Sequence, residues 1–251
     1  MSSVSPTSLP LNRSHTGSIQ EQTDRVVAAL LASLPPAEQL SADERRGIIA
    51  RYTAVLEGNF IYWMTGAYLS AGSEEARSIV LDNLREEVRD CHPGMLRKFA
   101  IAAHAVPKDT DALAVYRNLS NVRLFIGRLM PVPIIAMMAF FEGFIQRFMP
   151  YLAEVAQRQG SLEREYTDVH GVCDVGHTQE LFRALTAEME LAQDSREPLV
   201  NLLEGVELLK TLIQNIVADP NHPRRCDKEE NACINALANG GYSQAAVSLG
   251  K

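Results

Sequence analysis

Apolar residues recur at helical spacing along most of the chain, whereas the strict alternation that is typical of strands is nearly absent. One stretch shows the helical period well: Ile48, Ile49, Tyr52, Val55, Leu56, Phe60 and Trp63. Ser41 and Glu44 before it have the spacing of a capping box, and Ser73 can cap the next helix. The pattern therefore predicts an all-α protein.

Prolines and glycines divide this pattern into separate helices. The ranges that we expect are about 18–34, 41–71, 73–89, 93–105, 110–129, 132–159, 165–191 and 196–217, with a kink at Pro150. They predict one bundle of seven or eight helices over residues 19–218. A flexible arm, 1–18, would precede the bundle, and a polar tail, 219–251, would follow it.

Composition narrows the class of protein. The 251 residues are 46% hydrophobic and 22% charged with a net charge of −7, which is typical of a globular protein and argues against binding to nucleic acid. Four cysteines without a CxxC pair do not form a disulfide scaffold. The Ser/Thr-rich start has no signal-peptide pattern, and the longest apolar run, Pro131–Phe141, is short for a membrane span. We therefore expect a cytoplasmic protein without a membrane partner.

The segment from Asp168 to His177 is the most informative for chemistry. His170, Asp174 and His177 are spaced i, i+4 and i+7, which puts two imidazoles and a carboxylate on one face of a helix. Such a set is typical of Fe, Mn or Zn ligation. A polar helix surface is the alternative interpretation, because the motif is short.

Further acidic residues lie upstream. Glu142 directly follows the most apolar run, where an unpaired carboxylate would be expensive to bury. Glu57 is also an acid within an apolar helix, and a structural role is equally open for it. A third segment before Pro93 contains Glu86, Glu87, Asp90 and His92. Alone it is an ordinary charged helix end, but carboxylates and histidines from several helices together are how di-iron sites are built in helical bundles.

In chain order, these motifs are Asn83-Leu-x-x-Glu87, His92-Pro, Phe141-Glu142-Gly and His170-x3-Asp174-x2-His177. They resemble the haem-oxygenase-like di-metal oxidases over about 48–181. That family includes a decarboxylase that forms 1-undecene and an N-oxygenase of a nitrosourea pathway. The resemblance implies a haem-oxygenase-like bundle and the metal ligands Glu87, His92, Glu142, His170, Asp174 and His177. Glu57 is the nearest match to a further ligand that some members use.

The second motif departs from the family pattern. Glu87 and His92 are five residues apart, which separates them by about 140° on an ideal helix. The helix must therefore end or distort near Cys91. Glu86 is an alternative to Glu87, and Asp90 lies nearer to the face of Glu87. For the surroundings of the metals or the pocket, the candidates are Tyr166, Phe141 and Trp63.

The resemblance implies that the protein is a non-haem di-iron oxygenase of a biosynthetic pathway. Such an enzyme would bind two Fe(II) ions, use O2 as co-substrate and take electrons from an external donor such as a reductase. We favour N-oxygenation of a small amine toward a hydroxylamine or nitro group. Oxidative C–C cleavage, decarboxylation or desaturation of a small amino or fatty acid is the alternative. A metal-free hydrolase similar to thiaminase II and a non-catalytic binding protein also remain open, as does a homodimer.

Overall fold

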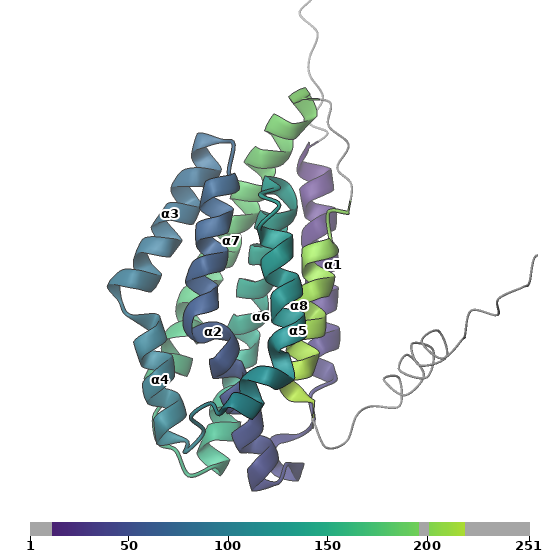
Figure 1. Ribbon diagram of the computed structural model, residues 1–251. Coiled ribbons are helices and arrows are strands. Elements are labelled where there is room, and N and C mark those ends of the chain that lie inside the picture. Colours follow the sequence, from purple (N-terminus) through teal and green to yellow (C-terminus); the bar gives the residue numbers. More distant parts are fainter. Residues whose placement is uncertain (1–11, 196–200, 219–251) are drawn as a thin grey trace, which may run out of the picture. The chain divides into compact units, whose positions relative to one another are not determined.

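The computed structural model describes residues 12–195 and 201–218. Within these ranges the chain forms eight α-helices, one short 3-10 helix and no strand (Figure 1). The elements are α1 (Asn12–Ala32), η1 (Ala37–Gln39), α2 (Ala42–Ser70), α3 (Glu74–Arg89), α4 (His92–Ala102), α5 (Asp109–Ile126), α6 (Pro131–Arg158), α7 (Glu165–Ser195) and α8 (Glu204–Val217). The predicted all-α class is confirmed. The predicted tail, 219–251, and residues 1–11 of the predicted arm lie outside the described residues.

Two helix starts follow the predicted capping residues. The hydroxyl of Ser41 accepts a hydrogen bond from the backbone N–H of Glu44, and the Glu44 carboxylate accepts one from the backbone N–H of Ser41. The hydroxyl of Ser73 likewise accepts from the backbone N–H of Ala76. These bonds satisfy amide donors that have no partner inside the helix, and they fix where α2 and α3 begin.

Several predicted boundaries are wrong by a few residues. Helix α1 begins at Asn12, six residues before the expected start at Ser18. The last helix begins at Glu204 after a turn at 201–203, and the expected start at Arg196 lies outside the described residues. Helices α4 and α5 end three residues early because His104 and Leu129 have left-handed backbone angles, with φ of 51° and 52°. Such angles do not continue a right-handed helix. Helix α6 continues through Pro150, and its bounds agree with the predicted range 132–159 to within one residue.

The most apolar helix, α6, forms the centre of the core. It packs against α7, α2, α8 and α1. By length and composition α6 could cross a membrane, but 89% of its most apolar window is buried within the structure. Its apolar side chains, such as Phe140, Phe144 and Phe148, are buried, and Phe148 packs against Tyr52 of α2.

The chain bends sharply between α3 and α4 (Figure 1). Helix α3 ends at Arg89, Cys91 has a left-handed φ of 55°, and α4 starts at His92 with Pro93 in its first turn. The predicted break near Cys91 is thus present. It places the last turn of α3 and the first residue of α4 beside each other, and both carry metal-ligand candidates.

Candidate metal centre

Six of the predicted ligand residues lie together in two buried clusters. The first, here the Glu87 cluster, consists of Glu87, His92 and His170. The second, here the Glu142 cluster, consists of Glu142, Asp174 and His177. Within each cluster the candidate ligand atoms all lie within 4.8 Å of one another. Helices α3, α4, α6 and α7 supply them, so residues 90 positions apart in sequence converge on one place.

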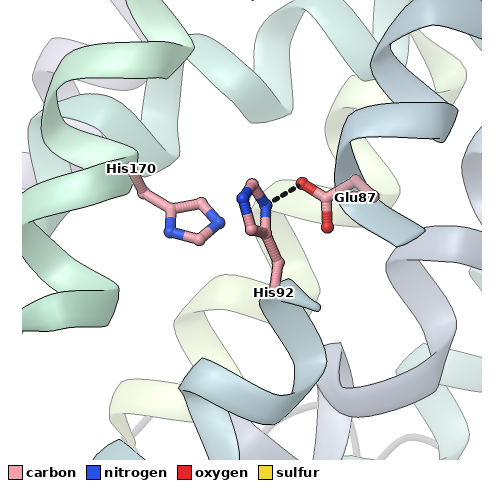
Figure 2. Close-up of side chains that lie close together, drawn as sticks. All are labelled: Glu87, His92 and His170. Atoms are coloured by element: carbon pink, nitrogen blue, oxygen red, sulfur yellow. Dashed lines mark hydrogen bonds and ion pairs between the residues drawn. The ribbon is translucent and has the colours of Figure 1, made fainter. Parts of the chain in front are cut away.

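The Glu87 cluster depends on the bend between α3 and α4. Figure 2 shows the ring of His92 between the ring of His170 and the carboxylate of Glu87. Nδ1 of His92 lies 2.7 Å from Oε1 of Glu87, and the two imidazole rings are 4.5 Å apart in an edge-to-face arrangement. Burial lowers the pKa of His92, but the hydrogen bond and the charge of Glu87 outweigh it and raise this pKa overall.

His170 is held by Tyr166, one helical turn earlier. Nδ1 of His170 lies 2.8 Å from the main-chain carbonyl oxygen of Tyr166, and the Tyr166 ring packs 4.3 Å from the imidazole. Donation from Nδ1 to this carbonyl leaves Nε2 with a lone pair. Burial lowers the pKa of His170 to about 4. The residue is therefore a neutral imidazole near neutral pH, which is the form that binds metals.

Among the described residues, neither carboxylate of the Glu142 cluster forms an ion pair with a lysine or an arginine. Glu142 comes from the middle of α6, and Asp174 and His177 come from one face of α7. Burial raises the pKa of Glu142 well above its ordinary value, and the charges of Asp174 and Glu87 add to this effect. The pKa of Asp174 is raised by burial and by Glu87. Oδ2 of Asp174 is buried and has no hydrogen-bond partner in the part of the chain that the structure describes.

These donors fit a pair of divalent iron ions. Buried carboxylates that repel one another are costly unless a cation or a proton neutralises them. An unpartnered buried carboxylate oxygen is uncommon in proteins and calls for a ligand. The Glu87 cluster offers two imidazoles and one carboxylate, a donor set typical of non-haem Fe(II) oxygenases. The Glu142 cluster offers one imidazole and two carboxylates.

Five of the six residues line the same cavity, and His177 instead lines a separate surface hollow. The other walls are mainly apolar and come from α2, α4, α6 and α7: Leu56, Phe60, Pro93, Leu96, Phe141, Ile145 and Tyr166. The space is small, since about 20 Å³ is open to the centre of a water molecule. That is room for about one or two water-sized species. The arrangement can hold metal ions in mainly apolar surroundings that leave little room for water.

The structure does not bring Glu57 or Asp90 into either cluster. Glu57 forms an ion pair with Arg97 of α4, and the α2 side chains that reach the cavity are Leu56 and Phe60. Asp90 is exposed and pairs with Arg89. Glu86 lies outside the Glu87 cluster, and its carboxylate instead contacts His177, at 2.9 Å. Of the alternatives within the second motif, the geometry favours Glu87.

Two of the three pocket candidates line the cavity, namely Tyr166 and Phe141. Trp63 is buried behind Phe141, with the two rings 5.3 Å apart, and does not line it. Sequence reasoning missed Tyr52, whose hydroxyl lies 2.8 Å from that of Tyr166. Tyr52 occupies an ordinary apolar position of the helical pattern, so no local signal distinguishes it.

Comparison with protein families identifies one match. Residues 49–209 match the model of a family described as iron-containing redox enzymes. The matched range contains all six residues of the two clusters. Comparisons with curated proteins and with solved structures give no match.

Proposed function

The chain belongs to the family of iron-containing redox enzymes, and from that premise we propose that it is a di-iron oxygenase that uses O2 to oxidise the nitrogen of a small amine. The observation that carries the proposal is the pair of buried clusters, Glu87–His92–His170 and Glu142–Asp174–His177. Six donors of these types suit two ferrous ions better than one. The family supports the redox chemistry, and the nitrogen as target is our own inference.

Iron, when bound in the ferrous state, supplies electrons to O2. The residues of the chain do the rest. Glu87, Glu142 and Asp174 would neutralise the positive charge of the bound ions, and His92, His170 and His177 would hold them as neutral donors. The apolar side chains around them exclude water, which protects reactive species from side reactions.

The cavity walls support an uncharged nitrogen as the reacting group. Among the described residues, no lysine or arginine lines the cavity, so an organic carboxylate has no cationic side chain to pair with there. The charged groups present are three carboxylates, whose charge the bound ferrous ions would neutralise, so the walls left to contact a substrate are mainly apolar. An amine that has lost its proton can bring its lone pair to this place, and Leu56, Phe60 and Ile145 would contact its carbon atoms.

The size of the cavity limits the substrate to a small molecule or requires the wall to move. Phe60 is the wall residue best suited to move, because it is only partly buried and packs against Phe141 with ring centres 5.7 Å apart. A rotation of Phe60, which is not one of the ligand residues, would enlarge the cavity. An external reductase or small reductant would restore ferrous iron between turnovers.

The test starts with the full-length protein, loaded anaerobically with Fe(II). It is then exposed to isotopically labelled O2 with a panel of small amines and, separately, small amino and fatty acids. The expected result is O2 consumption that depends on the amine, with the label in an N–O bond of the product. The matched control is His170→Ala, which removes one donor of the Glu87 cluster.

Other outcomes would overturn the proposal in distinguishable ways. If an acid substrate loses CO2, hydrogen or a carbon fragment and the label appears only in water, the protein catalyses oxidative cleavage or desaturation. If neither O2 consumption nor metal binding occurs, the metal-free hydrolase and the non-catalytic binding protein become the leading interpretations.

A further inference from the structure

Glu86 and His177 connect the Glu142 cluster to the protein surface. Oε2 of Glu86 lies 2.9 Å from Nε2 of His177, whereas Nδ1 of the same ring lies 3.9 Å from Oδ1 of Asp174. The two ring nitrogens therefore face different partners. One faces the surface acid and the other faces the buried cluster.

We propose that Glu86 is a positioning residue for the Glu142 cluster and not a metal ligand: it accepts the hydrogen bond from Nε2–H of His177 and so presents Nδ1 as the ligand atom. The inference rests on the proposed function, because it assumes that this cluster binds a metal. It assigns a role to an acid that neither the family match nor the ligand set explains.

The local structure supports this role in two ways. Glu86 has 41% of its side chain exposed. It is not among the residues that line the cavity with the carboxylates Glu87, Glu142 and Asp174. It lines an open surface hollow together with Cys173, Gly176, His177, Gln179, Glu180 and Arg183. Glu86 and its neighbour Glu87 lie on different faces of α3, because successive helix residues point about 100° apart.

A carboxylate in this position has a defined chemical effect. A neutral imidazole carries its proton on one nitrogen only, and the hydrogen bond made by that nitrogen selects the tautomer. Partners of this kind orient metal-binding histidines, and their loss typically weakens metal binding by about 10- to 100-fold. His170 has the equivalent support from a main-chain carbonyl, whereas His177 depends on a side chain from another helix.

The first experiment measures the His177 tautomer by nitrogen NMR of the imidazole in full-length protein treated with a chelator. In the wild type, the proton is expected on Nε2. Glu86→Ala should lose this preference, and Glu86→Gln should keep it, because the amide oxygen still accepts a hydrogen bond. Glu180→Gln is the matched control, since Glu180 lines the same hollow and forms an ion pair with Arg183. A proton on Nδ1 in the wild type would overturn the proposal.

The second experiment titrates Co(II) into the same four proteins and follows binding by calorimetry and by the absorption of the bound ion. The expected result is that Glu86→Ala weakens one of two binding events by about 10- to 100-fold. Glu86→Gln and Glu180→Gln should remain close to wild type. Equal binding by Glu86→Ala and wild type would refute the positioning role, and a loss as large in Glu86→Gln would indicate that Glu86 is itself a ligand. If the wild type binds no metal, the proposed function fails, whatever the tautomer shows.

Discussion

His92 and Glu87 bond directly to each other, with 2.7 Å between Nδ1 and Oε1. A metal ion bound by both of these atoms would replace that hydrogen bond. The two residues are brought together by a single left-handed residue, Cys91, although an ideal helix would point them apart. The Glu87 cluster is therefore sensitive to the backbone of this turn, whereas the Glu142 cluster is built on two uninterrupted helices.

The two clusters should lose metal independently. His170→Ala removes a donor from the Glu87 cluster, and His177→Ala removes one from the Glu142 cluster. In each variant we expect the iron content to fall from about two ions per chain toward one, because three donors suffice for a site and two rarely do. Anaerobic Fe(II) titration followed by metal analysis measures this. Glu57→Gln is the control and should retain both ions; unchanged iron in both histidine variants would refute the assignment.

The turn at Cys91 should control the Glu87 cluster. Cys91→Val puts a β-branched side chain at a φ of 55°, and we expect the branching to cost up to about 1 kcal/mol of unfolding free energy beyond the strain that Cys91 already bears. Cys91→Asn is the matched variant, since asparagine tolerates the left-handed region. Urea unfolding compares their stability, and metal titration should show weaker binding by the Glu87 cluster in the valine variant alone. Equal stability of the two variants would contradict the role of this turn.

The parts of the site that lie within one helix could be predicted from sequence. His170, Asp174 and His177 share a face of α7 because the helical period places them there. The choice between Glu86 and Glu87 could not be predicted, because it depends on how α3 is rotated about its axis against α7. Both residues turn out to have partners in the site, but only Glu87 lies inside the cavity.

The other differences between the predictions and the structure arise from contacts between residues far apart in sequence and from backbone angles. Glu57 has the sequence pattern of a buried ligand, but its partner Arg97 lies 40 residues later on another helix. Tyr52 and Tyr166 are 114 residues apart, so no local pattern could predict that their hydroxyls meet. Helix ends at His104 and Leu129 depend on left-handed backbone angles at residues whose type does not require them.

The stability of the metal-free protein should depend on pH through Glu142. Burial raises the pKa of this carboxyl well above its ordinary value of 4.5, so the folded state holds the proton more tightly than the unfolded state does. The Glu142 carboxyl therefore contributes its full stabilisation at pH values below its pKa in the unfolded state. This stabilisation is lost as the pH rises through the pKa of Glu142 in the folded state. Glu142→Gln removes this titration.

We therefore expect chelator-treated Glu142→Gln to gain unfolding free energy relative to wild type as the pH increases from about 4 to about 8. Urea unfolding at a series of pH values measures the difference. Added Fe(II) or Mn(II) should stabilise the wild type more than the variant, because the ion binds the deprotonated carboxylate. A difference between the two proteins that does not change with pH would refute this prediction.

The two buried tyrosines should behave as a coupled pair. The hydroxyls of Tyr52 and Tyr166 are 2.8 Å apart, and both side chains are buried. Tyr52→Phe or Tyr166→Phe leaves one buried hydroxyl without its partner, which should cost about 1–3 kcal/mol of unfolding free energy. The double variant removes both hydroxyls, so its loss should be smaller than the sum of the two single losses. Iron binding should persist in all three, because the carbonyl that holds His170 belongs to the main chain of Tyr166. Urea unfolding of the wild type, the two single variants and the double variant completes this double-mutant cycle. If the loss in the double variant equals the sum of the two single losses to within about 0.5 kcal/mol, the hydroxyls are not coupled.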